Sequence, residues 1–193
     1  MILPIVAFGH PVLRQKTEKI DREYPDLEVL IENMFETMYH ASGVGLAAPQ
    51  IGLSIRLFIV DGAPMIDRAA NEPELKTFQQ VFINPEVIEE DGKPWAFEEG
   101  CLSIPGLREN VNRKPLITVR YWDREWNERT ELLDGLRARI VQHEHDHLEG
   151  VLFTDYSSPL KKQLNNGKLQ RISRGDIVED YPMTYHRTPK QKA

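Results

Sequence analysis

Apolar residues recur at helical spacing in two stretches of the chain. Between residues 25 and 41 they fall three or four positions apart, which is typical of a helix that packs one face against a core. Residues 136–148 contain no glycine or proline, and we predict a second helix there. The side chains near one face of this second helix are Leu136, Ile140, His143, Glu144 and His147.

Runs of β-branched and aromatic residues between the two helices predict β-strands. These runs cover residues 55–60, 81–83, 116–122 and 128–133. Residues 61–80 are polar and contain two prolines, so we expect a surface loop. Because the strands cluster instead of alternating with helices, the order favours an α+β fold with antiparallel or mixed sheets around the second long helix.

The two ends of the chain carry weaker patterns. Residues 10–16 are expected to form a short helix. A further helix is expected to begin at residues 159–164 and to be interrupted at Asn165–Gly167, and residues 181–193 are expected to form a loosely held tail. The length of 193 residues suits one domain. We assign it to residues 1–158, with residues 159–193 as a partly helical extension that is not a separate domain.

Composition narrows the class of protein. Hydrophobic residues make up 40% and charged residues 28%, as in globular proteins, and the net charge is −6. This acidity argues against a broad nucleic-acid-binding surface, so we expect no direct sequence-specific nucleic-acid binding. No apolar run approaches the ~20 residues that span a bilayer. Cys101 is the only cysteine, which leaves no internal disulfide, and we expect a cytoplasmic protein without membrane contact.

The strongest chemical signal is the sequence HEHDH at residues 143–147. Four helical positions turn the chain by ~400° and advance it by ~6 Å, so His143 and His147 project from the same side and can share one metal ion. Glu144 can lean over the open side of the ion and take a proton from bound water. His145 points elsewhere, and we interpret it as a surface histidine.

Two imidazoles do not complete a catalytic metal site, which usually has three protein ligands. The candidates for the third ligand are Cys101, His10, His40, His186 and a carboxylate. Residue types alone favour Cys101 only slightly. Gly100 beside it allows close approach of the backbone, and a metal would hold the thiol as thiolate.

Residues 43–52 are rich in glycine but match neither a P-loop nor a dinucleotide-binding pattern. One interpretation is a tight turn between the first long helix and the next strand. The other is a wall along which the backbone of a substrate runs, with the Gln50 amide as a hydrogen-bond donor. The sequence favours neither.

Three segments together resemble a known family. GVGLAAPQ at residues 43–50, EGCLS at residues 99–103 and QHEHDHL at residues 142–148 are similar to the three signature motifs of the peptide deformylases, in the same order. General similarity extends over about residues 5–159. The resemblance implies that the enzyme removes the formyl group from N-formylmethionine at the start of new polypeptides and releases formate.

Residue by residue, the resemblance makes Cys101, His143 and His147 the metal ligands and Glu144 the general acid and base. Gln50 and the backbone N–H of Leu102 become donors to the developing oxyanion. The residues we expect to bind the substrate, most of them apolar, are Val44, Gly45, Gly100, Leu136 and Ile140.

The resemblance also implies Fe²⁺ as cofactor, with Zn²⁺, Ni²⁺ or Co²⁺ able to replace it. The expected partners are N-formylmethionyl nascent peptides and, transiently, the ribosome. Two alternatives remain at this point. One is a zinc metallopeptidase that cuts internal peptide bonds, and the other is a non-catalytic module that binds nascent chains and is stabilised by a metal.

Overall fold

A five-stranded antiparallel sheet forms the largest layer of the protein. The structure, a computed structural model, describes residues 1–68 and 72–186. The strand order in the sheet is β2-β3-β4-β7-β8. These strands span Gly45–Ala47 (β2), Leu57–Asp61 (β3), Gln79–Asp91 (β4), Leu116–Trp122 (β7) and Glu128–Asp134 (β8).

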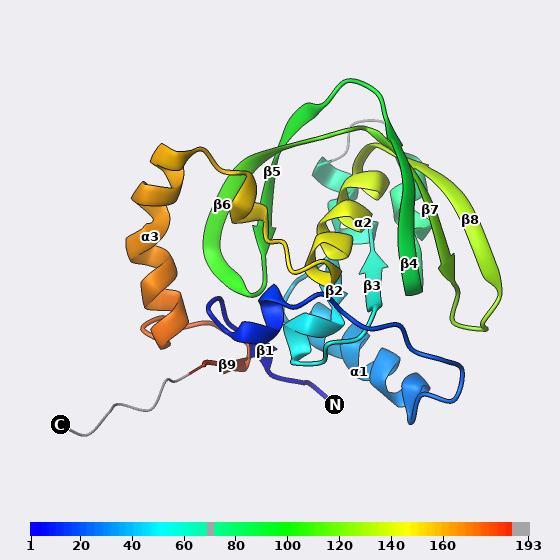
Figure 1. The fold of residues 1–193 in the computed structure, drawn as a ribbon, viewed down its shortest axis with the longest axis horizontal. Helices are drawn as coiled ribbons and strands as arrows, with labels where there is room; N and C mark the ends of the chain where they lie inside the picture. Colours follow the sequence, from blue (N-terminus) through cyan, green and yellow to red (C-terminus); the bar gives the residue numbers. More distant parts are fainter. Residues whose placement is uncertain (69–71, 187–193) are drawn as a thin grey trace.

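Helix α2 (Gly135–Leu148) follows β8 and runs between this sheet and a two-stranded hairpin (Figure 1). The hairpin pairs β5 (Trp95–Cys101) with β6 (Ile104–Arg113). Helix α1 (Leu27–His40) packs on the face of the sheet opposite α2, against β2, β3 and β4, and α3 (Pro159–Arg174) lies outside the hairpin. The short strand β1 (Ile5–Val6) pairs in parallel with β9 (Met183–Thr184), so segments near the start and near the end of the described chain lie side by side.

Five short 3₁₀ helices connect these elements. They span Pro11–Arg14 (η1), Ala48–Ile51 (η2), Ala63–Arg68 (η3), Pro73–Thr77 (η4) and Phe153–Tyr156 (η5). None of the helices in the described ranges is both long and apolar enough to cross a membrane.

Three apolar clusters hold the layers together. The first joins α2 to the sheet through residues such as Val141, Phe58 and Phe82. The second joins α1 to the same sheet, and the third joins the hairpin to α3, whose Ile172 is fully buried. Because α2 is packed on both sides, its position relative to the hairpin is fixed, and this brings residues 143–147 next to the end of β5.

The predicted α+β class, the two long helices and the antiparallel sheet around α2 are confirmed. The strand predicted at residues 81–83 is much longer, since β4 continues to Asp91. The hairpin β5–β6 was not predicted. Its alternation of buried and exposed positions is regular in β6, but the buried positions include charged residues such as Glu109 and Arg113, which hide the pattern in the sequence.

The prediction of a surface loop over residues 61–80 is wrong. This stretch contains η3 and η4 and buries Met65, Leu75 and Phe78 in the core beside the sheet. The polar residues whose burial the structure describes in this stretch are exposed or half-buried between these apolar anchors, so its average polarity concealed three core positions. Residues 69–71 lie outside the described residues.

Two predictions for the C-terminal part are also corrected. Helix α3 continues through Asn165–Gly167 to Arg174, because a glycine in an exposed helix costs only about 1 kcal/mol and the Ser158 side chain caps the start. Residues 181–186 are not a loose tail, since β9 pairs with β1. The rest of the predicted tail, residues 187–193, lies outside the described residues.

Candidate metal centre

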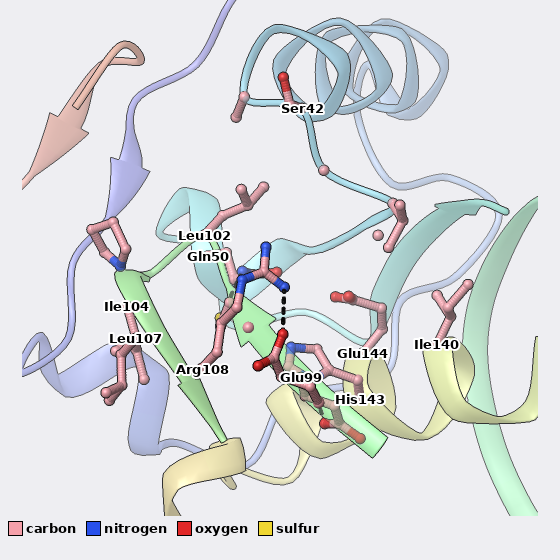
Figure 2. Close-up of a pocket in the computed structure, with 18 of the residues that line it drawn as sticks. Ser42, Gln50, Glu99, Leu102, Ile104, Leu107, Arg108, Ile140, His143 and Glu144 are labelled. Atoms are coloured by element: carbon pink, nitrogen blue, oxygen red, sulfur yellow. Dashed lines mark hydrogen bonds and ion pairs between the residues drawn. The ribbon is translucent and has the colours of Figure 1, made fainter. Parts of the chain in front are cut away.

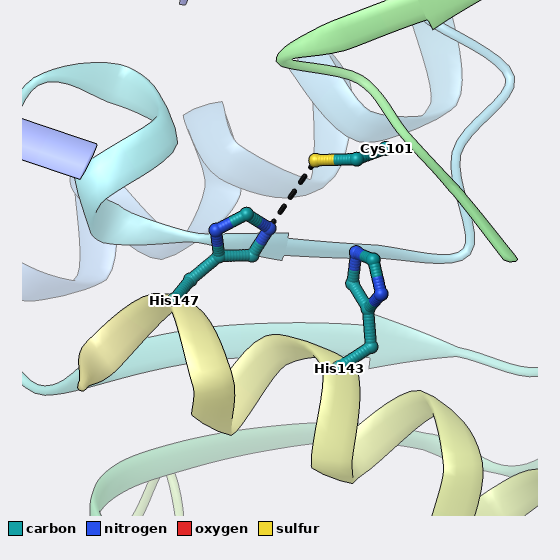
Figure 3. A group of neighbouring side chains, drawn as sticks. All are labelled: Cys101, His143 and His147. Carbon is teal, nitrogen blue, oxygen red and sulfur yellow. Dashed lines mark hydrogen bonds between the residues drawn. The ribbon is translucent and has the colours of Figure 1, made fainter. Parts of the chain in front are cut away.

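Three side chains from two distant parts of the chain converge at the end of the hairpin (Figure 3). One ligand atom each of Cys101, His143 and His147 lies within 4.8 Å of the others. The Cys101 Sγ is 3.3 Å from Nε2 of His147. The other histidines that we considered as third ligand are outside this group: His10 and His186 face each other, with ring centroids 5.3 Å apart, and His40 ends α1.

Local structure explains why these three residues meet. The two histidines are one turn apart on α2 and both point toward β5 (Figure 3). Cys101 is the last residue of β5, and the register of the hairpin shifts between Gly100 and Cys101. A shift of this kind re-aims a side chain, and here the thiol faces the helix.

The donor set fits a divalent transition metal ion. His143 uses Nδ1 to contact the Glu99 carboxylate at 3.0 Å, which leaves Nε2 for a metal. Burial lowers the pKa of His147 well below its usual range, so this imidazole is neutral, as a ligand must be. One thiolate with two imidazoles is a set that binds zinc, iron and neighbouring metals.

The carboxylate of Glu99 organises the back of the site. It accepts hydrogen bonds from Nε of Arg113 at 2.7 Å and from Nη1 of Arg139 at 2.7 Å. Burial raises the pKa of Glu99, but hydrogen bonds from His143 and Arg113 outweigh this and hold the pKa well below its usual range. Arg113 also donates to Asp146 at 2.8 Å.

Sequence reasoning missed the supporting roles of Glu99 and Arg139. Glu99 belongs to the EGCLS segment, so a signal was present, but nothing in the local pattern indicated which histidine it contacts. Arg139 is placed on α2 one turn before His143, and at 3% exposure it is a buried cation that requires a partner.

Glu144 is buried at 4% exposure, and its Oε2 has no hydrogen-bond partner within the described chain. Burial raises the pKa of Glu144 to about 7. A side chain at Gly45 would collide with this carboxylate, so the glycine allows β2 to pass close beside it. A buried acid without a partner, with a pKa near neutrality, is suited to proton transfer.

Gln50 is also buried, and its amide is held in one orientation. Its Oε1 accepts from the backbone N–H of Ala47 at 2.8 Å, which turns Nε2 toward Cys101 Sγ at 3.4 Å. Leu102 is the first residue of the hairpin turn after Cys101. Both residues line the same cavity as Cys101 and His143 (Figure 2).

Four of the five residues expected to bind substrate line this cavity, namely Val44, Gly45, Gly100 and Ile140. Leu136 does not. It is 2% exposed and packs in the core between α2 and the sheet, because it lies one turn of α2 further from the cavity than Ile140.

The interpretation of His145 as a surface histidine is also wrong. Its side chain is only 17% exposed, and Nε2 lies 3.2 Å from Nη2 of Arg56. The face of α2 opposite His143 and His147 is therefore packed too, against the loop before β3.

A helix that presents two imidazoles and a buried carboxylate to a cavity, opposite a thiol, is the arrangement of a metal-dependent hydrolase.

Comparisons with known proteins identify the family. The family model for polypeptide deformylase matches residues 2–163. The peptide deformylase of Christiangramia forsetii is 53% identical over the full length of both chains, and that of Flavobacterium psychrophilum is 54% identical over 95% of this chain and 96% of its own.

The fold agrees with this result. The crystal structure of a peptide deformylase from Legionella pneumophila superimposes with a TM-score of 0.78 at 39% identity, covering 91% of this chain and 98% of that chain. The chain belongs to the peptide deformylase family, as the resemblance of its motifs implied. It is a hydrolase that removes the N-formyl group from new polypeptides, and the metallopeptidase and the non-catalytic binding module are not favoured.

Proposed function

We propose that Cys101, His143 and His147 bind one divalent metal ion and that the formyl group is hydrolysed beside it. The observation that carries this assignment is the convergence of the three ligand atoms within 4.8 Å, next to a buried Glu144 whose Oε2 has no partner. When bound, such an ion supplies Lewis-acid chemistry, which polarises a carbonyl group and makes water more acidic.

Glu144 is the general base and then the general acid. It accepts a proton from the attacking water, whose oxygen bonds to the formyl carbon, and it returns the proton to the nitrogen when the C–N bond breaks. Formate and a free amino group are the products. The pKa of about 7 suits both steps, because a group with this pKa gains and loses a proton readily at neutral pH.

Gln50 Nε2 and the backbone N–H of Leu102 stabilise the negative charge that develops on the formyl oxygen. Gln50 is fixed for this role by its hydrogen bond with Ala47, and a donor fixed in advance needs no reorganisation during the reaction. Val44 and Ile140, which line the cavity, would receive the methionine side chain, and Gly45 and Gly100 would leave room for the peptide.

The metal in the cell is proposed to be Fe²⁺, with Zn²⁺, Ni²⁺ or Co²⁺ able to replace it. Affinity alone favours zinc over ferrous iron, so the distinction needs a measurement. Purification without oxygen followed by metal analysis is expected to give iron, and activity is expected to fall on exposure to air. Recovery of zinc alone would contradict the assignment.

The test of the metal centre is formate release from formyl-Met-Ala-Ser, with the unformylated peptide as control. Cys101→Ser is expected to lose the metal on challenge with a chelator, and activity with it, because an alcohol is a far weaker ligand than a thiolate. The matched control is Ser103→Ala, in the same hairpin turn. If Cys101→Ser kept its metal as well as Ser103→Ala, Cys101 would not be a ligand.

We also propose that the substrates are N-formylmethionyl nascent peptides, met in the cytoplasm through transient contact with the ribosome. Exposed basic residues on α3, among them Lys162 and Arg174, support a contact with nucleic-acid phosphates. Co-sedimentation with ribosomes is expected to weaken for the double charge reversal Lys162→Glu with Arg174→Glu and not for Arg22→Glu, an exposed control far along the chain. Equal binding of all three proteins would refute the role of α3.

Residues 159–193 are proposed to be an integral extension of the catalytic domain at residues 1–158. The buried Ile172 of α3 and the pairing of β9 with β1 support this division.

A further inference from the structure

The C-terminal segment returns to the candidate active site. After α3, residues 181–185 run along β1 on the side of the β5–β6 hairpin (Figure 1). Tyr181 lines the cavity that contains His143 and Glu144. Its hydroxyl donates a hydrogen bond of 2.8 Å to the backbone carbonyl of Leu102.

We call residues 181–185 the C-terminal strap. Three of its side chains are half-buried and alternate with exposed ones, the pattern of a strand with one packed face. Tyr181 packs near Leu102, whereas Met183 and Tyr185 pack against the cluster that joins the hairpin to α3. The packed face of the strap therefore joins two apolar clusters, that of α1 and the sheet and that of the hairpin and α3.

The strap supports two successive carbonyl groups of the hairpin turn. Tyr181 binds the carbonyl of Leu102 directly. The next carbonyl, that of Ser103, accepts from the backbone N–H of Phe8 at 2.8 Å. Phe8 follows β1, which the strap holds through hydrogen bonds from Ile5 N–H to the carbonyl of Pro182 and from Ala7 N–H to the carbonyl of Thr184.

We propose that Tyr181 is a positioning residue for deformylation. Its hydrogen bond anchors the peptide unit that follows Leu102, which is joined through the Leu102 Cα to the unit that carries the Leu102 N–H, and so narrows the rotation open to that N–H. The inference rests on the proposed role of that N–H as an oxyanion donor. A donor contributes most when its orientation is set before the reaction. A turn residue held only through its neighbours would be free to rotate, and the hydrogen bond from Tyr181 restricts that rotation.

Two further observations support a donating hydroxyl at this position. Burial raises the pKa of Tyr181 well above its usual range, so the phenol keeps its proton throughout the physiological range. The phenol ring is also half-buried against the same apolar cluster as Leu102, and its hydroxyl has the Leu102 carbonyl as its hydrogen-bond partner. The hydrogen bond to Leu102 is therefore expected to persist in solution.

The test compares Tyr181→Phe with Tyr185→Phe in steady-state hydrolysis of formyl-Met-Ala-Ser. Each change removes one hydroxyl from the same face of the strap, but the Tyr185 hydroxyl makes no hydrogen bond with the described part of the chain. For Tyr181→Phe we expect kcat to fall roughly five- to tenfold, with KM within about twofold and metal content unchanged, the size of effect of one neutral hydrogen bond. Amide hydrogen exchange at Leu102 is expected to become faster. Tyr185→Phe is expected to match the unmodified protein in all four measurements.

The possible outcomes distinguish a failure of the proposed function from a failure of the positioning role of Tyr181. If the unmodified protein released no formate, the proposed function would fail before the variants were compared. If it were active but Tyr181→Phe kept the same kcat, the positioning role would be wrong. The role would also be wrong if both variants lost kcat equally, or if Tyr181→Phe lost metal in proportion to activity, since either result would indicate general support of the fold.

Discussion

Two buried carboxylates, those of Glu99 and Glu144, lie on either side of His143 and have opposite surroundings. Glu99 contacts two arginines and the histidine, and the pKa of its carboxyl is held well below the usual range. Glu144 has an oxygen without a partner in the described chain, and burial raises its pKa to about 7. Both side chains are less than 7% exposed, so burial alone does not explain the difference.

The difference shows how one small region supplies both rigidity and chemistry. A carboxylate with charged partners cannot take part in proton transfer, because protonating it would break three interactions, but it can orient an imidazole. A carboxylate without partners destabilises the folded protein and is available to the substrate. We infer that Glu99 holds the site and that Glu144 acts in it.

The largest expected effect is that of Glu144→Gln. Removing the proton acceptor is expected to lower kcat by about 10²- to 10⁴-fold, while metal content and the melting temperature are kept, because Glu144 makes no hydrogen bond through Oε2 that the fold depends on. Steady-state formate release and metal analysis on the same sample provide the measurement. A variant that retained near-normal kcat would remove Glu144 from the mechanism.

The matching change in the other carboxylate is Glu99→Gln, and its main expected effect is a loss of folding stability. It leaves the buried guanidinium groups of Arg113 and Arg139 without their carboxylate, and this is expected to cost about 3 kcal/mol in the free energy of unfolding. Metal affinity is expected to fall about 10- to 100-fold, since His143 loses its orienting partner. Denaturant unfolding and chelator competition measure the two effects. Similar profiles for Glu99→Gln and Glu144→Gln would refute the division of roles.

A smaller effect is expected for Asp146→Asn. Arg113 keeps its two bonds to Glu99 and loses only the charge of its third partner, so we expect a loss of about 1 kcal/mol in the free energy of unfolding and a few-fold change in metal affinity. Denaturant unfolding of Asp146→Asn and Glu99→Gln under the same conditions compares the two losses of unfolding free energy. A loss as large as that of Glu99→Gln would mean that Asp146, and not Glu99, is the main support.

The smallest effect is expected at Glu86, a paired carboxylate at the surface. Hydrogen bonds from Lys19 and Arg120 lower its pKa from 4.5 to about 2. Its contribution to stability is therefore present above pH 4.5 and is lost as the pH falls toward 2. For Glu86→Gln we expect a loss below about 1 kcal/mol at neutral pH that disappears in acid, because water screens exposed pairs. Thermal unfolding of both proteins between neutral pH and pH 2 measures this loss. A loss of stability that grew as the pH fell would contradict the prediction.

Much of the fold followed from local patterns. The stripe that predicted α1 and the unbroken run that predicted α2 were sufficient, since helical periodicity depends on residues three and four apart. The hairpin β5–β6 was missed because its buried face carries Glu109 and Arg113, whose partners lie in other elements. The strap was missed because β9 has only two residues, and its packed face is evident only beside β1.

The residues of the candidate site also divide into those that the sequence predicted and those that it did not. The spacing of His143 and His147 predicted that they would share a ligand, because one helical turn separates them in any fold. Cys101 was only slightly favoured as the third ligand on residue type, and the motif resemblance strengthened it. Leu136 was wrongly expected in the substrate pocket. Helical spacing predicts which face of α2 a residue occupies, but it does not predict whether that turn of the helix meets the cavity or the core.

By itself the sequence determined the family, the helix that carries two imidazoles and an acid, and the segments that accompany it, since each depends on neighbours along the chain. Only the tertiary structure decided that Glu99 meets Arg113, Arg139 and His143, that Glu144 is buried without a partner for Oε2, and that Tyr181 reaches Leu102. Ionisation and orientation depend on burial and on groups far apart in the chain, and both are set only when the layers pack together.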